Sequence, residues 1–112
     1  MSDGSVSQIP VAQVAGLVEA GAAFIDVREH QETSMGKAPG VVCMPMQSFS
    51  LDDLAGGVPL VLICRSGARS DAVANALAGM GFTTYNVTGG MIAWQSAGLP
   101  IVAEDGSSGT VF

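Results

Sequence analysis

The fold of this chain is decided by the stretch Leu60-Val61-Leu62-Ile63-Cys64-Arg65-Ser66-Gly67-Ala68-Arg69-Ser70. Its first four residues are aliphatic, which is typical of a short strand buried on both faces of a parallel sheet. A small, polar and basic loop follows, and apolar residues then recur at the helical positions 73, 76, 77 and 80. The pattern predicts strand, loop and helix, with Cys64 at the carboxyl end of the strand, where open α/β sheets bind ligands.

The surroundings of Cys64 favour a reactive thiolate. A cysteine attacks as the thiolate, which nearby arginines and the free N–H groups of a helix N-terminus both stabilise. Arg65 and Arg69 lie in the loop, directly before the expected helix. Gly67 and Ala68 are small, so the N–H groups of the loop can turn inward and form a concave anion site. The loop therefore predicts a cysteine that attacks or carries an anionic group. The alternative is an inert thiol in the core.

Composition indicates one globular domain with few basic groups. The chain has 112 residues, of which 48% are hydrophobic and 12% are charged, and this is enough for a core without disulfides. Its net charge of -6 argues against nucleic acid or an anionic membrane as a partner. We expect a cytoplasmic protein, because the sequence shows neither a signal pattern nor an apolar stretch of transmembrane length. Cys43 and Cys64 give no metal-ligand spacing, and we expect no metal and no cofactor.

Glycines mark the ends of the expected helices in a series of alternating helices and strands. Three expected helices end at Gly21, Gly81 and Gly98, and each is followed by apolar residues. Helices are expected over 11–18, 29–35, 48–54, 71–80 and 90–94, and strands over 22–28, 41–44, 60–63 and 83–87. This alternation predicts an α/β fold with a parallel sheet. The expected organisation is a lead-in over 1–7, a domain over 8–102 and a tail over 103–112.

Several motifs, taken together, resemble a single-domain rhodanese. They are Asp26-Val27-Arg28-Glu29, the loop from Cys64 to Ser70, Gly81-Phe82, Gly89-Gly90 with Trp94, and Gly98-Leu99-Pro100. The resemblance runs from about Val11 to Val102 and implies a three-layer α/β/α fold. The implied sheet has five parallel strands in the order 3-2-4-5-1, with a very short first strand around Ile9. The implied activity is sulfur transfer, in which the thiolate of Cys64 takes the outer sulfur of thiosulfate, holds it as a persulfide and passes it to cyanide or a thiol.

The same resemblance implies roles for the loop residues. The substrate-binding loop would consist of Arg65, Ser66, Gly67, Ala68, Arg69 and Ser70. Arg69 would hold the loop and the anionic donor, while Arg65, nearer the rim, would attract thiosulfate. The partners would be a small anionic sulfur donor and a thiol or protein sulfur acceptor, and the sequence identifies neither of them.

Asp26 and Arg28 would be supporting residues by the same resemblance. Asp26 is expected near the active-site loop, and Arg28 is expected to pair with Glu29 or Glu32. A plain structural ion pair is the alternative to a direct role in the chemistry. The family often has a histidine where this chain has Lys37, which leaves the geometry of the loop over 36–40 open.

Loop length bears on the alternative functions of this fold. Phosphatase relatives have a longer loop between the cysteine and the arginine, whereas only four residues separate Cys64 from Arg69 here. The short loop favours a sulfurtransferase over a cysteine phosphatase or an arsenate-type reductase. A non-catalytic binding or regulatory module is the other alternative, and the intact cysteine and arginines argue against it. Cys43 is expected to be a small apolar residue at a strand end, or else a thiol that resolves an oxidised Cys64.

Overall fold

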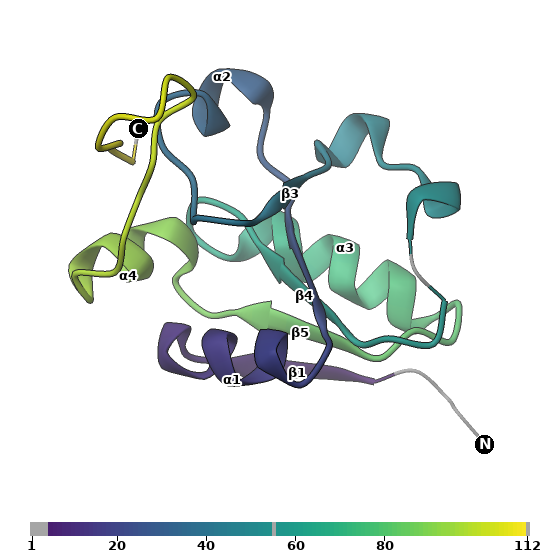
Figure 1. Cartoon of the computed structure of the whole chain (residues 1–112). Coiled ribbons are helices and arrows are strands. Elements are labelled where there is room, and N and C mark those ends of the chain that lie inside the picture. Colours follow the sequence, from purple (N-terminus) through teal and green to yellow (C-terminus); the bar gives the residue numbers. More distant parts are fainter. Residues whose placement is uncertain (1–4, 55, 112) are drawn as a thin grey trace.

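The computed structural model describes residues 5–54 and 56–111, and in these the chain forms a five-stranded parallel sheet with helices on both faces (Figure 1). The strands are β1 (Val6–Ile9), β2 (Ala23–Asp26), β3 (Val42–Cys43), β4 (Leu60–Ile63) and β5 (Thr84–Val87). Their order across the sheet is β3-β2-β4-β5-β1. The α/β fold and the strand order expected from the sequence are therefore confirmed. β4 lies at the centre of the sheet, and Cys64 follows its last residue.

Helices and short 3-10 turns connect the strands. They are η1 (Val11–Gln13), α1 (Val14–Glu19), α2 (His30–Thr33), η2 (Met46–Ser48), η3 (Leu51–Asp53), α3 (Ala68–Ala78) and α4 (Gly90–Ser96). Gly21, Gly81 and Gly98, expected to terminate helices, all have positive φ angles. That conformation is the one in which glycine ends a helix most easily. The sequence does not predict η2, and it places the start of α3 near Ser70, two residues later than the structure does.

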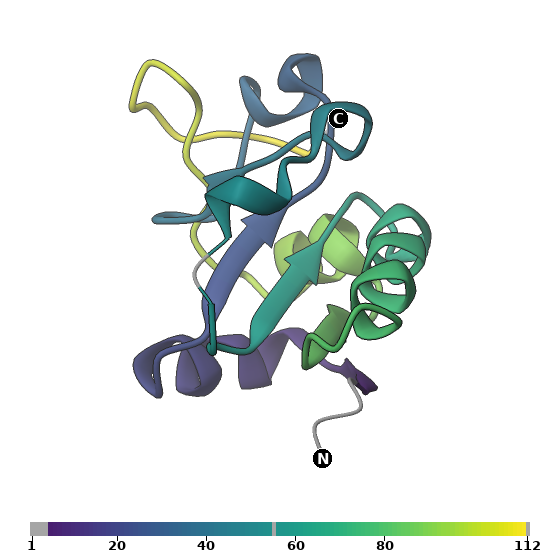
Figure 2. The same ribbon diagram turned by 90° about the vertical axis from the view of Figure 1, so that its right-hand side faces the viewer.

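The two faces of the sheet pack against different helices. All four side chains of β4 are fully buried, and alternate residues enter opposite clusters. Val61 and Ile63 pack with residues of α1 and α4, whereas Leu60 and Leu62 pack with residues of α3. This alternation gives the three layers, because successive side chains of a strand point to opposite faces. Figure 2 shows α3 (green) on one side of the strands and the C-terminal segment (yellow) on the other.

The chain ends differ from the expected lead-in and tail. Residues 1–4 and 112 lie outside the described residues, but β1 begins at Val6, so the sheet starts before the domain boundary expected at residue 8. The segment after Val102 folds back on residues 34–37. The N–H of Glu104 donates to the carbonyl of Ser34, and the N–H of Thr110 donates to the carbonyl of Met35 (both 2.9 Å). Because the segment is held by backbone hydrogen bonds, its sequence shows no periodic pattern of apolar residues. The sequence alone therefore predicts only a tail after Val102.

Backbone hydrogen bonds to Val102 hold Lys37, in the loop over 36–40 whose geometry the sequence left open. The N–H of Lys37 donates to the carbonyl of Val102, and the N–H of Val102 donates to the carbonyl of Lys37, each at 2.9 Å. The side chain at this position is therefore not needed for these contacts. Within the described part of the chain, no helix has both the length and the apolar character to cross a membrane.

Candidate active site

Cys64 lies at the carboxyl end of the sheet with hydrogen-bond donors around its sulfur. Its side chain is fully buried. The N–H of Gly67 lies 3.0 Å from Sγ, the N–H of Ser70 lies 3.3 Å away, and the Ser70 hydroxyl is also at 3.3 Å. Backbone N–H groups that converge in this way stabilise a negative charge without giving up a proton. The donors expected from the loop sequence therefore surround the Cys64 sulfur.

Gly67 makes the sharp entry from the loop into α3. It is the N-cap residue of that helix and has a φ of +104°, in the left-handed region. A Cβ at this position would lie 3.3 Å from the nitrogen of Gly89 and 3.4 Å from the oxygen of Val87. Glycine therefore satisfies both the backbone conformation and the close packing against β5 and the turn after it. The turn places the first N–H groups of α3 toward the sulfur.

Asn86 supports the loop from β5, and the sequence reasoning misses it. Its Oδ1 lies 2.5 Å from the Ser70 hydroxyl, and its Nδ2 donates to the carbonyl of Gly67 (3.2 Å) and to Oε1 of Gln8 (2.8 Å). The Ser70 hydroxyl has one proton and three acceptors within reach, namely Asn86 Oδ1, the Cys64 sulfur and the carbonyl of Gly67, so it serves only one of them at a given moment. A buried amide inside a strand is the signal that could have identified this residue.

Glu32 from α2 holds Arg69 beside the loop. Arg69 donates to both carboxylate oxygens of Glu32, at 2.6 and 2.8 Å. The carboxylate also accepts the N–H of Glu29 in a capping box at the start of α2, which fixes its orientation. The hydrogen bond from Arg69 lowers the pKa of Glu32 despite its burial, and the same bond raises the pKa of Arg69. The negative charge of a Cys64 thiolate further raises the pKa of Arg69.

Arg28 pairs with Asp26, so the expected pairing with Glu29 or Glu32 is wrong. Both side chains are fully buried, with Nη2 of Arg28 2.8 Å from Oδ2 of Asp26. Residues two apart at a strand end project to the same side, which places these two in contact. Nη2 also donates to the carbonyl of Gly36 at 2.7 Å. The positive charge of Arg28 contributes to the lowered pKa of Glu32, behind the larger effect of Arg69.

The N-terminus of α4 donates hydrogen bonds to the backbone at the end of β4. The N–H of Met91 donates to the carbonyl of Cys64 (2.8 Å), and the N–H of Ile92 donates to the carbonyl of Arg65 (3.0 Å). Gly90 makes this approach possible: its φ is +54°, and a Cβ there would collide with both carbonyl groups. The sequence identifies the Gly89-Gly90 pair as the start of a helix, but not this contact with Cys64 and Arg65.

The remaining loop residues lie at the surface. Arg65, Ser66 and Ala68 are exposed at the mouth of the site. A cavity of about 270 Å³ opens beside them; it is lined by Gln8, Ser66, Gly67, Ala68, Asp71, Asn86, Thr88 and Gly89. Neither Cys64 nor Arg65 lines this cavity, and Asp71 contributes a carboxylate to it, so the cavity does not mark the route of an anion to the sulfur.

Cys43 and Cys64 are free thiols on opposite faces of the sheet. Cys43 stands opposite Asp26, which stands opposite Ile63, so these three share one face. Cys64 follows Ile63 and therefore points to the other face, into the cluster packed against α3. Cys43 is exposed, and its position argues against its resolving an oxidised Cys64 within one molecule.

Comparisons with known proteins agree with this geometry. Residues 10–97 match the sequence model of the rhodanese-like domain. YtwF of Bacillus subtilis, which is named as a candidate sulfurtransferase, is 40% identical over 79 residues, covering 69% of this chain and 77% of YtwF. The thiosulfate sulfurtransferase GlpE of Pseudomonas savastanoi pv. phaseolicola is 34% identical over 93 residues, covering 80% of this chain and 87% of GlpE. A solved rhodanese-related protein of Thermoplasma volcanium superposes with a TM-score of 0.79 at 26% identity, covering 86% of this chain and 97% of that one.

Proposed function

The chain belongs to the rhodanese-like domain family, and on this premise we propose that it is a sulfurtransferase that carries sulfane sulfur on Cys64. The observation that carries the proposal is the set of N–H groups of Gly67 and Ser70 directed at the Cys64 sulfur. A persulfide ends in an anionic, polarisable sulfur, which backbone donors stabilise without a general base. The name of GlpE, thiosulfate sulfurtransferase, supports thiosulfate as the donor class.

In the first step, the thiolate of Cys64 attacks the outer sulfur of thiosulfate. A new S–S bond forms on Cys64, the S–S bond of thiosulfate breaks, and its electron pair leaves with sulfite. No proton is transferred, and the total charge is unchanged. Two positive groups assist an anionic donor: Arg65 at the exposed mouth of the site, and Arg69 beside the sulfur. The bidentate contact with Glu32 keeps Arg69 in place for this role.

In the second step, an acceptor removes the outer sulfur. Cyanide attacks the terminal sulfur of the persulfide, forms thiocyanate and returns Cys64 to the thiolate. A thiolate acceptor does the same and leaves with the sulfur as its own persulfide. The short loop of four residues between Cys64 and Arg69 supports this chemistry over phosphate hydrolysis. We also propose a cytoplasmic setting, where cysteines stay reduced and available for transfer.

Intact-protein mass spectrometry after incubation with thiosulfate tests the proposal. The wild type is expected to gain the mass of one sulfur atom, and cyanide or a thiol is expected to remove it. Cys64→Ser should gain nothing, whereas Cys43→Ser, the matched cysteine control, should behave as the wild type. Absence of the adduct in folded, reduced wild-type protein would reject the persulfide carrier and favour a binding module. Hydrolysis of an aryl phosphate that depends on Cys64 would instead support a phosphatase.

A further inference from the structure

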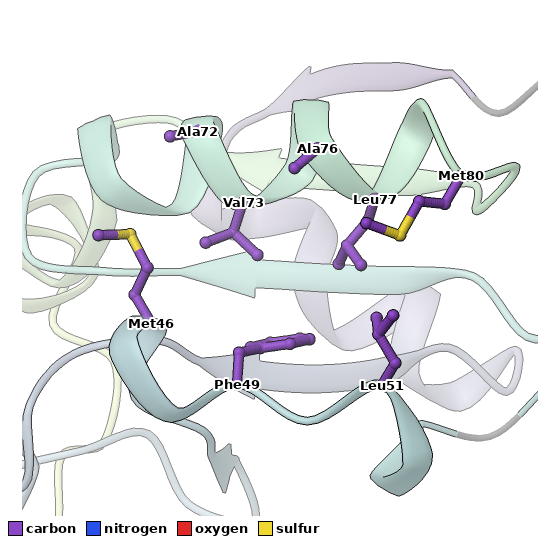
Figure 3. A pocket seen from close by; sticks show the side chains of 8 residues that line it. All are labelled: Met46, Phe49, Leu51, Ala72, Val73, Ala76, Leu77 and Met80. Carbon is purple, nitrogen blue, oxygen red and sulfur yellow. The ribbon is translucent and has the colours of Figure 1, made fainter.

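An apolar groove runs along α3, on the side of the sheet that carries Cys64. One wall consists of Ala72, Val73, Ala76 and Leu77 of α3 together with Met80 in the turn after the helix, and the other consists of Met46, Phe49 and Leu51 from the η2–η3 segment. Figure 3 shows these side chains facing one another across the space between α3 and the η2–η3 segment, with β4 behind them. The groove has a volume of about 460 Å³. All eight side chains are apolar, so the groove offers no polar group to a small, charged substrate.

The groove has a fixed floor and a wide apolar rim. Leu77 is only 2% exposed and belongs to the core beneath α3, and Val73 packs against the same core. At the rim, Met46, Leu51 and Met80 are 37%, 47% and 59% exposed. Large apolar side chains that are exposed together and border a groove are typical of a surface that binds another protein.

The shape of the groove fits the apolar face of a helix. Ala72 and Ala76 are one helical turn apart on α3, and their small side chains allow another backbone to approach closely. Methionine side chains stand at both ends of the groove, Met46 at the end near Ala72 and Met80 next to Leu77 at the other end (Figure 3). Methionine is flexible and polarisable, so it adapts to apolar anchors of different shapes. Apolar residues spaced at helical intervals on a partner would occupy such a groove.

The charges near the groove indicate which charged residues should flank the apolar face of the partner helix. None of the eight residues that line the groove is charged, and none of the four Lys and Arg of the chain is among them. Asp52 and Asp53 follow Leu51 in η3 and are exposed. With a net charge of -6, the chain attracts a basic segment and repels a second copy of itself. A partner helix with Lys or Arg beside its apolar anchors complements this surface.

The groove also begins close to the catalytic loop. Ala72 stands one turn after Ala68, the first residue of α3, and Gly67 and Ser70 at this end of the helix contact the Cys64 sulfur. We propose that the groove docks an amphipathic helix with basic flanks that belongs to a protein exchanging sulfur with Cys64. The docking rests on the groove itself, and the exchange of sulfur rests on the function proposed above.

Two synthetic peptides test the docking without any sulfur chemistry. Both carry the same leucines at helical spacing; one has lysine and the other has glutamate at all flanking positions. Each is titrated into the full chain labelled with ¹⁵N, once as the wild type and once as Cys64→Ser. The lysine peptide is expected to shift the amide signals of α3 and the η2–η3 segment in both proteins, and the glutamate peptide is expected to leave them unchanged. Ala76→Arg should weaken lysine-peptide binding roughly tenfold or more.

Matched variants and a second assay separate the outcomes. Ala15→Arg introduces the same charge on the exposed side of α1 and should bind the lysine peptide as the wild type does. Met80→Lys, at a more exposed position, replaces Ala76→Arg if that variant fails to fold. Equal binding of both peptides, unchanged binding by Ala76→Arg, or shifts outside the groove would overturn the proposal. So would a wild-type dimer in light scattering that Ala76→Arg dissociates, since a second copy would then cover the groove. Because binding is read in Cys64→Ser, loss of the persulfide proposal leaves this result standing.

Discussion

Ser70 supplies two of the donors around the Cys64 sulfur, its N–H and its hydroxyl, each at 3.3 Å. Ser70→Ala removes the hydroxyl and keeps both N–H donors in place. We expect kcat/KM for thiosulfate to fall about tenfold or less, because the developing anion loses one hydrogen-bond donor. The effect is limited because the Ser70 hydroxyl also donates its proton to Asn86. Steady-state kinetics with cyanide as the acceptor measure this effect. Ser96→Ala, at the exposed C-terminal end of α4, is the control and should retain full activity. A complete loss in Ser70→Ala would show that the hydroxyl has a larger role than the N–H groups.

The ion pair between Glu32 and Arg69 makes stability depend on pH in a defined direction. Arg69 lowers the pKa of Glu32 below its ordinary value of 4.5, so the folded state favours the carboxylate. Its contribution is therefore complete above about pH 4.5 and is lost as the pH falls through the folded-state pKa. Because Arg69 is partly exposed, we expect Glu32→Gln to lower the free energy of unfolding by only about 1 kcal/mol at neutral pH. Urea unfolding across the acidic range should show this difference shrinking. A difference that is constant with pH would contradict the assignment.

Residue partners were harder to predict than residue identities. The sequence identifies Cys64, Arg69, Asp26 and Arg28. The structure places Asp26, Arg28 and Cys64 at or just after the ends of β2 and β4, and Arg69 in the first turn of α3. The sequence pairs Arg28 with a glutamate, however, whereas Glu32 binds Arg69 across 37 positions of the chain. Strand periodicity could have placed Arg28 beside Asp26. No local pattern reports how α2 is oriented toward the loop, so the partner of Arg69 could not be deduced.

At the scale of the elements, α4 donates backbone hydrogen bonds to the carbonyls of Cys64 and Arg65, and Gly90 tests that contact. Gly90→Ala places a Cβ against the carbonyls of Cys64 and Arg65 at a φ of +54°. We expect the free energy of unfolding to fall by about 2 kcal/mol or more, since both backbone strain and a steric collision result. Sulfur transfer should fall as well, because the loop must shift. Urea unfolding and steady-state kinetics measure the two effects.

Gly16→Ala is the matched control for this prediction. Gly16 lies inside α1, and a Cβ there meets nothing within 4 Å. This variant should gain about 0.5–1 kcal/mol, the usual preference for alanine inside a helix, and keep full activity. Equal stability of Gly90→Ala and the wild type would mean that α4 can move away from the loop without cost.

The ends of helices could be predicted from the sequence where a glycine terminates the helix, but not where packing against the rest of the fold decides them. The helix ends at Gly21, Gly81 and Gly98 were predicted, because a left-handed glycine is a local property of the sequence. The region over 48–54 was predicted as one helix, yet it contains only the end of the short turn η2 at Ser48 and the short turn η3. Phe49 and Leu54 pack against the core beneath α3, and this contact fixes the segment as an apolar wall. Long-range packing of this kind overrides helix propensity in a short segment.

At the scale of the whole molecule, the C-terminal segment connects the chain end to the charged groups of the site. Thr110 binds the carbonyl of Met35, and Gly36, the next residue, offers its carbonyl to Arg28. The sequence could not predict this connection, since glycine, serine and threonine in the tail form no periodic pattern. The domain limits drawn from motifs accordingly leave the segment outside the fold, although it packs on residues 34–37. Removing it should therefore affect more than the tail itself.

A chain ending at Val102 tests this connection. It loses the hydrogen bonds of Glu104 and Thr110 to residues 34–37, and we expect the free energy of unfolding to fall by about 1–3 kcal/mol. Amide exchange should rise first over 34–37, since local opening starts where contacts are lost. Gly109→Ala disrupts the same contact in the full-length chain, because its Cβ would lie 2.7 Å from Cα of Gly36 and 2.9 Å from the carbonyl oxygen of Met35. The two variants should increase exchange in the same segment, and both should still form the Cys64 persulfide. Exchange that rises uniformly over the sheet would instead mean that the segment supports the whole domain rather than this loop.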